Sequence, residues 1–383
     1  MPSLYVHIPF CVRKCEYCDF YSEAAGERDI DRYLVALECE FTLRYPDGIA
    51  PETVFLGGGT PTRLSAEQLR TLGEIFKRRV DLSRCIEFTC EINPGTLTPE
   101  KADALVALGV DRASFGVQSF NPDFLKSLGR IYEVGTPPQA VAMARAAGIT
   151  RVSMDLMFAL PGQNLTQLRD DLHQALSFGT EHLSLYALTY EDDTPLTRDL
   201  QSGKVQPCPE ELERAMFSTV GDFCAKSGLQ RYEVSNFARP GAECRHNLVY
   251  WRVGEWAGLG AGAHSMLDHE IIENAADHKA YADALEAGKL PFVRREKLTV
   301  GRQVETLLLM ALRLDEGVEV ARLDALIGEK FTARAADALE TLTRQGLIEC
   351  GAHLRCTDRG LMVLDSVILE IACVLDRTTA LPA

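Results

Sequence analysis

Short apolar runs alternate with helical periods over the first 235 residues, and this alternation constrains the fold more than any other feature. The apolar runs have the length of buried strands, and the segments between them repeat apolar residues at helical spacing. Repeated strand–helix units predict a parallel sheet with right-handed crossovers. Six units are too few for a complete eight-stranded barrel, so we expect a partial (β/α)6 barrel. The expected strands are residues 4–10, 53–56, 87–91, 112–117, 152–159 and 182–189.

Residues that can bind or react lie at or just after these expected strands. Cysteines follow the first strand and a glycine run follows the second, while Glu91, Gln118 and Asp155 belong to the next three. In a β/α barrel the carboxyl ends of the strands share one face, and active sites form there. The sequence therefore predicts one site that five separate segments build together.

Cys11, Cys15 and Cys18 have the spacing Cys-x3-Cys-x2-Cys, with no fourth cysteine in register. Three thiolates can hold three irons of a 4Fe–4S cluster and leave the fourth iron open to a small molecule. A structural zinc ion would normally take four ligands. His7 is the fourth ligand that a zinc site would need, but it lies inside an apolar, strand-like run.

The cysteine spacing, preceded by Tyr-x-His-Ile-Pro-Phe-Cys at residues 5–11, resembles the radical S-adenosylmethionine superfamily. Within it, the chain is similar to the oxygen-independent coproporphyrinogen dehydrogenases and, more closely, to the HemW-type haem chaperones. The dehydrogenases carry a further cysteine two residues after the third, and Phe20 stands at that position here. The resemblance covers nearly the whole chain. It implies the partial barrel of the superfamily, a 4Fe–4S cluster on the three cysteines, and S-adenosylmethionine.

The same resemblance implies a role for each residue of the cofactor site. Glu91 would pair with the amino group of the cofactor, Arg130 with its carboxylate, and Gln118 and Asp155 with its ribose hydroxyls. An aspartate within an apolar strand is costly to bury without a partner, which favours a binding role for Asp155. A flexible turn, a solvated arginine and a core aromatic remain the alternatives for the glycine run, Arg130 and Tyr5. The full implied set is Tyr5, Tyr17, Gly58, Gly59, Thr60, Glu91, Gln118, Arg130 and Asp155.

A second segment, residues 244–251, contains the pattern Cys-x-His-Asn-x2-Tyr-Trp. His246 offers an imidazole to haem iron, Tyr250 and Trp251 offer flat apolar surface, and Cys244 is an alternative or additional ligand. Judged on composition alone, such a run more often serves packing. The resemblance favours haem, because His-Asn-x2-Tyr-Trp marks the haem chaperones and not the dehydrogenases.

The chain changes character after residue 235. Residues 236–297 are rich in glycine, alanine and aromatics and are expected to form a small mixed segment that handles haem or covers the barrel. Residues 298–383 suggest three helices followed by a hairpin, which is typical of a winged-helix-like domain. This last region carries nine Lys and Arg against thirteen Asp and Glu, so it lacks the basic surface that duplex binding requires.

The overall net charge of −15 argues against nucleic acid and against adsorption to anionic lipid. There is no long apolar run and no signal peptide, and most of the twelve cysteines lie in apolar or periodic segments, so a reducing cytoplasm is expected.

The leading hypothesis is a haem chaperone that binds haem as cargo and transfers it to acceptor proteins. Its candidate partners are haem-accepting proteins, membrane-associated haem enzymes among them, an electron donor for the cluster, and a second copy of the chain. The alternative is an oxygen-independent coproporphyrinogen III dehydrogenase that carries out a radical oxidative decarboxylation. Phe20 counts against this alternative, so we expect that activity to be absent.

Overall fold

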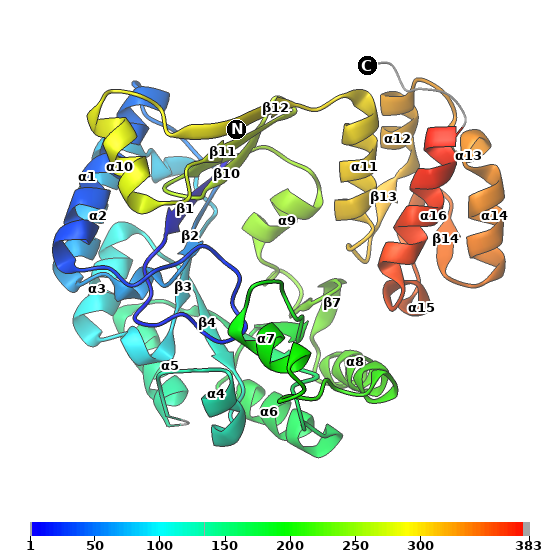
Figure 1. The fold of residues 1–383 in the computed structure, drawn as a ribbon, viewed down its shortest axis with the longest axis horizontal. Coiled ribbons are helices and arrows are strands. Elements are labelled where there is room, and N and C mark those ends of the chain that lie inside the picture. Colours follow the sequence, from blue (N-terminus) through cyan, green and yellow to red (C-terminus); the bar gives the residue numbers. More distant parts are fainter. Residues whose placement is uncertain (1, 134, 378–383) are drawn as a thin grey trace.

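A twelve-stranded sheet organises most of the chain in a computed structural model that describes residues 2–133 and 135–377 (Figure 1). Its central strands β1 to β6 are parallel neighbours in sequence order, as a partial (β/α)6 barrel requires. The predicted α/β fold class is therefore confirmed. The bounds of these strands are Ser3–Ile8, Thr53–Gly58, Glu87–Ile92, Arg112–Gln118, Arg151–Phe158 and His182–Ala187.

Helices cover the outer face of the parallel strands and form the main hydrophobic core with it (Figure 1). Alternate strand residues such as Leu4, Val6, Val54 and Leu56 are buried in this core. The longer helices are α1 (Glu27–Arg44), α2 (Ala66–Arg79), α3 (Pro99–Leu108), α5 (Thr136–Ala147), α6 (Leu165–Ser177) and α8 (Glu210–Lys226). The shorter ones are α4 (Pro122–Ser127), α7 (Pro195–Gln201), η1 (Pro61–Arg63), η2 (Leu82–Arg84) and η3 (Pro94–Thr96).

The other set of alternate residues on these strands is largely polar. On β3 the set is Glu87, Thr89 and Glu91, and the neighbouring strands contribute Ser114 and Asp155. Since successive side chains of a strand point to opposite faces, these residues line the inner face of the partial barrel. Buried polar groups need partners, so this face is built for hydrogen bonding and not only for packing.

Both edges of the sheet are extended by further strands, which pair antiparallel except for β9, a parallel partner of β1. Beyond β6 lie β8 (Asn236–Ala238) and β7 (Gln230–Glu233). Beside β1 lie β9 (Trp256–Leu259), β10 (His264–Leu267), β11 (Glu270–Asn274) and β12 (Phe292–Lys297), with α10 (His278–Glu286) between the last two. Residues 236–297 thus contribute five strands to the barrel sheet.

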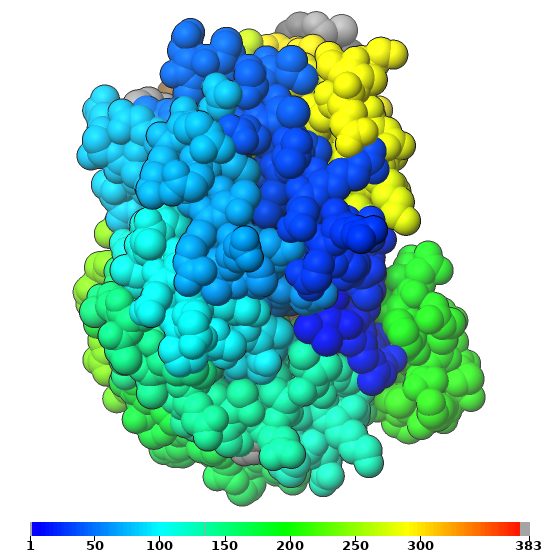
Figure 2. All heavy atoms as spheres, turned by 90° about the vertical axis from the view of Figure 1, so that its left-hand side faces the viewer, coloured from blue at the N-terminus to red at the C-terminus, as the bar shows by residue number. Residues whose placement is uncertain are grey.

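This extension packs against the N-terminal helix α1, far away in the sequence. Arg32 on α1 forms ion pairs with Asp283 and Glu286 on α10. The yellow surface of the extension lies directly against the blue surface of the N-terminal segments in Figure 2.

The C-terminal region has a core of its own and a three-stranded antiparallel sheet in the order β13-β15-β14. Two residues of α9 (Arg245–Trp251), Leu248 and Trp251, pack into this core and so connect it with the barrel. Every helix in the described ranges is too short or too polar to cross a membrane. The elements are α11 (Val300–Ala311), β13 (Val318–Glu319), α12 (Val320–Ile327), α13 (Phe331–Arg334), α14 (Ala336–Arg344), β14 (Ile348–Cys350), β15 (His353–Cys356), α15 (Asp358–Leu361) and α16 (Leu364–Arg377).

Candidate functional site

The three predicted cluster cysteines lie in the loop that follows β1, and each is partly exposed. Two of their sulfur atoms have polar neighbours: Cys11 Sγ lies 3.5 Å from Thr60 Oγ1, and Arg130 Nη1 donates to Cys15 Sγ over 3.4 Å. Donors beside sulfur stabilise thiolates, the form that binds iron. Burial raises the pKa of Cys18 to about 11, so iron binding would displace a proton from this thiol. The donor set therefore fits a cluster held by three thiolates.

Across residues 2–133 and 135–377, no group of three or more His, Cys, Asp or Glu side chains is arranged to hold a single metal ion. The zinc alternative gains no support from His7, because its two ring nitrogens contact Tyr5 and the carbonyl of Tyr21. A 4Fe–4S cluster differs from zinc in that its thiolates bind separate irons.

The predicted glycine run ends β2 and lies tightly against β1. A side chain at Gly58 would collide with the ring of His7, since its Cβ would fall 2.5 Å from that ring, and the φ of +106° also favours glycine. A Cβ at Gly59 would approach the backbone nitrogen of Phe10 to 2.8 Å. The run is thus a fixed close approach between two strands and not a flexible turn.

Two carboxyl groups lie on the inner face, and one of them, Glu91, contacts this run. Glu91 Oε2 accepts the Gly58 N–H over 3.1 Å, and Asp155 Oδ1 accepts the Ser114 hydroxyl over 3.0 Å. Burial, reinforced by the charge of Asp155, raises the pKa of Glu91 to about 8. Burial also raises the pKa of Asp155, although the hydroxyls of Ser184 and Ser114 oppose this. A cationic ligand placed here would remove the repulsion between the two carboxylates.

Arg130 is oriented by contacts at the end of β4. Its Nη2 donates to the carbonyl of Gly116, and its guanidinium lies 5.1 Å from the ring centre of Tyr132. Its Nε is buried without a hydrogen-bond partner. A Cβ atom added to Gly116 would lie 3.5 Å from Arg130 and 3.1 Å from the Gln118 side chain, so both side chains are close to this glycine. Gln118 itself has a φ of +68°. Arg130 and Gln118 thus lie side by side at the end of β4, and Tyr132, which was not singled out from the sequence, lies next to them.

The two tyrosines assigned to the cofactor have different surroundings. The Tyr5 hydroxyl lies 2.9 Å from His7 Nδ1, and His7 Nε2 lies 3.0 Å from the carbonyl of Tyr21. A carbonyl can only accept, so Nε2 carries the proton and Tyr5 donates to Nδ1. Burial lowers the pKa of His7 to about 4, which keeps this ring neutral. Tyr17 instead packs against an apolar cluster that includes Phe124 and Leu128.

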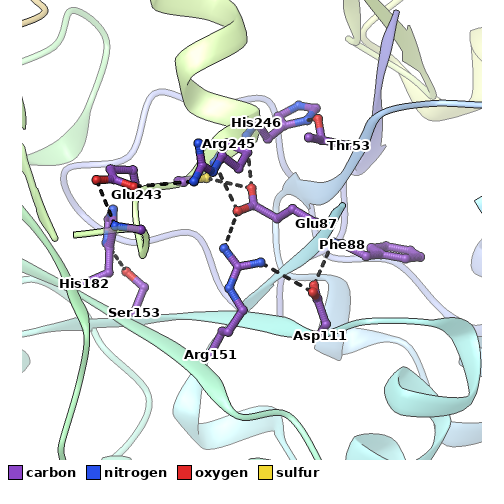
Figure 3. Close-up of polar contacts among 12 residues, drawn as sticks. Thr53, Glu87, Phe88, Asp111, Arg151, Ser153, His182, Glu243, Arg245 and His246 are labelled. Carbon is purple, nitrogen blue, oxygen red and sulfur yellow. Dashed lines mark hydrogen bonds and ion pairs between the residues drawn. The ribbon is translucent and has the colours of Figure 1, made fainter. Parts of the chain in front are cut away.

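The segment predicted to bind haem lies elsewhere, at the amino ends of β2 and β3 (Figure 3). Glu87, the first residue of β3, accepts the backbone N–H groups of Arg245 and His246, each over 3.0 Å. Its carboxylate also accepts from Arg151 over 2.8 Å and from Cys244 Sγ over 3.4 Å. The first turn of α9 is thus docked on one buried carboxylate, at the strand ends opposite those of the cysteine loop.

His246 is fully buried, and both of its ring nitrogens are engaged. Nδ1 lies 2.7 Å from Thr53 Oγ1, and Nε2 lies 2.7 Å from the Tyr250 hydroxyl. Thr53 donates to Ser3, so Nδ1 donates to Thr53 and Nε2 accepts from Tyr250. This is the tautomer that iron ligation through Nε2 requires, with the lone pair covered by Tyr250.

Glu87 and Arg151 were not identified from the sequence. The available signal was a row of charged first residues, Glu87, Arg112 and Arg151, on adjacent strands that otherwise read as buried. Charged side chains at such positions are rarely buried unless they are paired.

Comparisons with known proteins agree with this arrangement. Residues 5–175 match the family model described as "Radical SAM superfamily", and residues 300–363 match "HemN C-terminal domain". The solved structure of coproporphyrinogen III oxidase (HemN) from Escherichia coli has the same fold, with a TM-score of 0.82 at 23% identity over 99% of this chain and 91% of that one. The fold and the cysteine loop therefore define a radical SAM protein, a class that takes a 4Fe–4S cluster and S-adenosylmethionine.

Curated relatives identify the branch. A "Heme chaperone HemW" of Bacillus subtilis is 37% identical over 91% of this chain and 93% of its own length. The protein of the same name from Escherichia coli is 33% identical over 96% of this chain and 97% of its own length. The mitochondrial "Radical S-adenosyl methionine domain-containing protein 1" of Danio rerio is 33% identical over 98% of this chain and 87% of its own length. The chain belongs to the HemW heme chaperone family.

Proposed function

We propose that this protein is a haem chaperone, which binds haem and transfers it to acceptor proteins. The observation that carries the proposal is the similarity to named heme chaperones over more than nine-tenths of the chain. The cysteine loop is consistent with it, because the dehydrogenases carry a cysteine where this chain has Phe20, a residue that is 65% exposed.

We further propose that the inner-face residues hold S-adenosylmethionine beside the cluster. The cofactor and the cluster together would supply one-electron chemistry when bound. Glu91 would accept from the amino group of the cofactor and Arg130 would pair with its carboxylate. Gln118 and Asp155 would accept from the ribose hydroxyls. Three contacts support the assignment: Gln118 and Arg130 lie together at the end of β4, Asp155 is bonded to Ser114 of the same strand, and Glu91 is bonded to the glycine run.

Cofactor binding is expected to depend on pH through Glu91. Its pKa of about 8 means that it is mostly protonated at neutral pH, whereas pairing with an ammonium group favours the carboxylate. S-adenosylmethionine should therefore release up to about one proton from Glu91 as it binds near pH 7, and affinity should rise toward pH 8. Calorimetry of the reconstituted protein in buffers of different ionisation enthalpy measures this. Glu91→Gln should release correspondingly fewer protons, and equal release from both proteins would rule out the assignment.

We propose that His246 becomes a haem ligand when the side chain of Tyr250, on the same helix α9, turns away from its Nε2. The tautomer favours this role, since Nδ1 is already held by Thr53 and Nε2 needs only to lose the Tyr250 hydroxyl. In the present arrangement His246, Cys244, Tyr250 and Trp251 serve as packing and hydrogen-bonding groups. Their role as haem contacts stays a prediction.

Anaerobic reconstitution followed by two assays on one sample tests the function. Haem should pass from the protein to an apo-haemoprotein, and coproporphyrinogen should remain unchanged. Formation of protoporphyrinogen would overturn the chaperone proposal in favour of the dehydrogenase.

Haem titration of variants, followed at the Soret band, tests the ligand. His246→Ala should weaken binding by tenfold or more on the scale of a lost ligand. Tyr250→Phe keeps the ring, frees Nε2 and should bind at least as tightly as the parent. His264→Ala, which changes a histidine with a 54% exposed side chain, is the control. Unchanged affinity in both His246→Ala and Cys244→Ala would remove this segment from the haem site.

Partners and location remain proposals. A cavity of about 430 Å³ beside Cys11 is lined by Arg63 and Lys101 and by no carboxylate, which suits an electron donor with an acidic surface. Haem-accepting partner proteins are proposed on the same basis as the function. A homodimer, a cytoplasmic location and domain limits at residues 235 and 297 stay predictions from the sequence.

A further inference from the structure

The cluster loop returns to the strand from which it leaves. Glu23 forms a parallel bridge with Phe10, so the two ends of the loop are held side by side. The Cys11 N–H donates to the Glu23 carbonyl over 2.9 Å, and the Glu23 N–H donates to the Pro9 carbonyl over 2.8 Å. The backbone of the first cysteine is therefore fixed by the position of Glu23.

The side chain of Glu23 is held from a distant part of the chain. Its Oε1 accepts from the Tyr21 hydroxyl and from Nδ1 of His278, the first residue of α10. The Tyr21 hydroxyl in turn accepts the backbone N–H of His278 over 2.9 Å. Tyr21, Glu23 and His278 thus form a closed set of hydrogen bonds between the loop and α10.

His278 is placed for this contact at a cost. Its side chain is 5% exposed, and its Nε2 is buried without a hydrogen-bond partner. Because a carboxylate only accepts, Nδ1 carries a proton, and Nε2 is left without a partner, which is unfavourable in a buried position. The ring also meets Phe10 edge-on at 5.6 Å, next to Cys11. An apolar side chain would fill this space without the unpaired nitrogen, so the contact with Glu23 accounts for the histidine.

Helix α10, which begins at His278, is bound to α1 by a buried polar network. Glu40 of α1, which is fully buried, accepts from Tyr281 of α10 over 2.6 Å and from Asn274 over 2.8 Å. It also pairs with Arg44 over 3.1 Å. Movement of α10 away from the barrel would break this buried network, so α10 offers a fixed reference for the loop.

We propose that Tyr21, Glu23 and His278 form a loop clamp, a set of positioning residues that holds the cysteine loop in the geometry that the cluster needs. The clamp makes cluster retention depend on α10, although α10 supplies no cysteine ligand. It rests on cluster binding and not on the haem role, so it can fail while the chaperone proposal stands.

The test compares full-length variants in two measurements: hydrogen exchange of residues 9–23 before iron is added, and the anaerobic rate of iron loss to a chelator after reconstitution. His278→Ala should speed both by about tenfold or more, the scale of a lost charge-assisted hydrogen bond. His278→Asn places an amide N–H where Nδ1 lies and should recover most of the loss. Tyr21→Phe removes one hydroxyl from the clamp and should have a smaller effect in the same direction.

His264→Ala, in the same extension, is the matched control and should change neither rate. If His278→Ala fails to fold, Tyr21→Phe and His278→Asn carry the test. Unchanged exchange and iron loss in His278→Ala, or in Tyr21→Phe when the alanine variant is unfolded, would overturn the clamp. So would His278→Asn behaving like His278→Ala, because rescue through the amide is what separates hydrogen bonding from packing.

Discussion

Replacing any one of Cys11, Cys15 or Cys18 by alanine is expected to abolish stable cluster binding. With three protein thiolates for a cluster of four irons, the parent has no spare ligand, and two thiolates rarely retain a cluster. Iron in the reconstituted variants should fall from about four atoms per chain to near zero, with loss of the brown colour. Iron and sulfide analysis with visible absorption, under anaerobic conditions, measures the effect.

Cys85→Ala is the control for this series. Cys85 is partly buried and donates to the Glu87 carbonyl, away from the cysteine loop. Its loss should leave the iron content at the parent value. A cluster that persists in Cys15→Ala would show that another residue completes the set.

Replacing Glu87 by alanine is expected to cost the largest share of stability of any single change outside the main hydrophobic core. Glu87 is 1% exposed and is the common acceptor for the first turn of α9 and for Arg151. Removing it leaves buried amides and cationic groups without their partner, which should lower the free energy of unfolding by about 3–5 kcal/mol. Urea unfolding should show this loss, and hydrogen exchange at Arg245 and His246 should accelerate as α9 undocks.

Glu243→Ala is the matched control, because this carboxylate lies near α9 but its ion pair with Arg245 is long, at 3.8 Å, and partly exposed. It should change the free energy of unfolding by less than about 1 kcal/mol. Equal effects of the two substitutions would mean that Glu87 does not dock α9.

The contribution of Glu87 should also depend on pH. Burial alone would raise its pKa, but the charge of Arg112, the N–H groups of His246 and Arg245, and the charge of Arg151 outweigh burial and lower it. A carboxyl with a lowered folded pKa stabilises the fold fully above its unfolded pKa of about 4.3, and this stabilisation is lost as pH falls through the folded value. The stability difference between parent and Glu87→Ala should therefore shrink in acid.

Local sequence patterns were sufficient to predict the central sheet. The six parallel strands and their order follow from apolar runs separated by helical periods, and the cysteine loop, the glycine run and Glu91 lie at their carboxyl ends as expected. The sequence indicated a small mixed segment over residues 236–297 but did not locate its strands, because short edge strands such as β10 have little periodicity of their own and gain order by pairing with the sheet.

The sequence by itself determined the class of cofactor, because Cys-x3-Cys-x2-Cys needs no tertiary information to indicate an iron–sulfur cluster with an open position. Only the tertiary structure decided where His246 lies, since its surroundings come from Thr53 and Glu87, which are more than 150 residues away along the chain. A motif specifies which groups are present. Their accessibility depends on which distant strand ends bury them, and here the start of β3 holds α9 against the barrel.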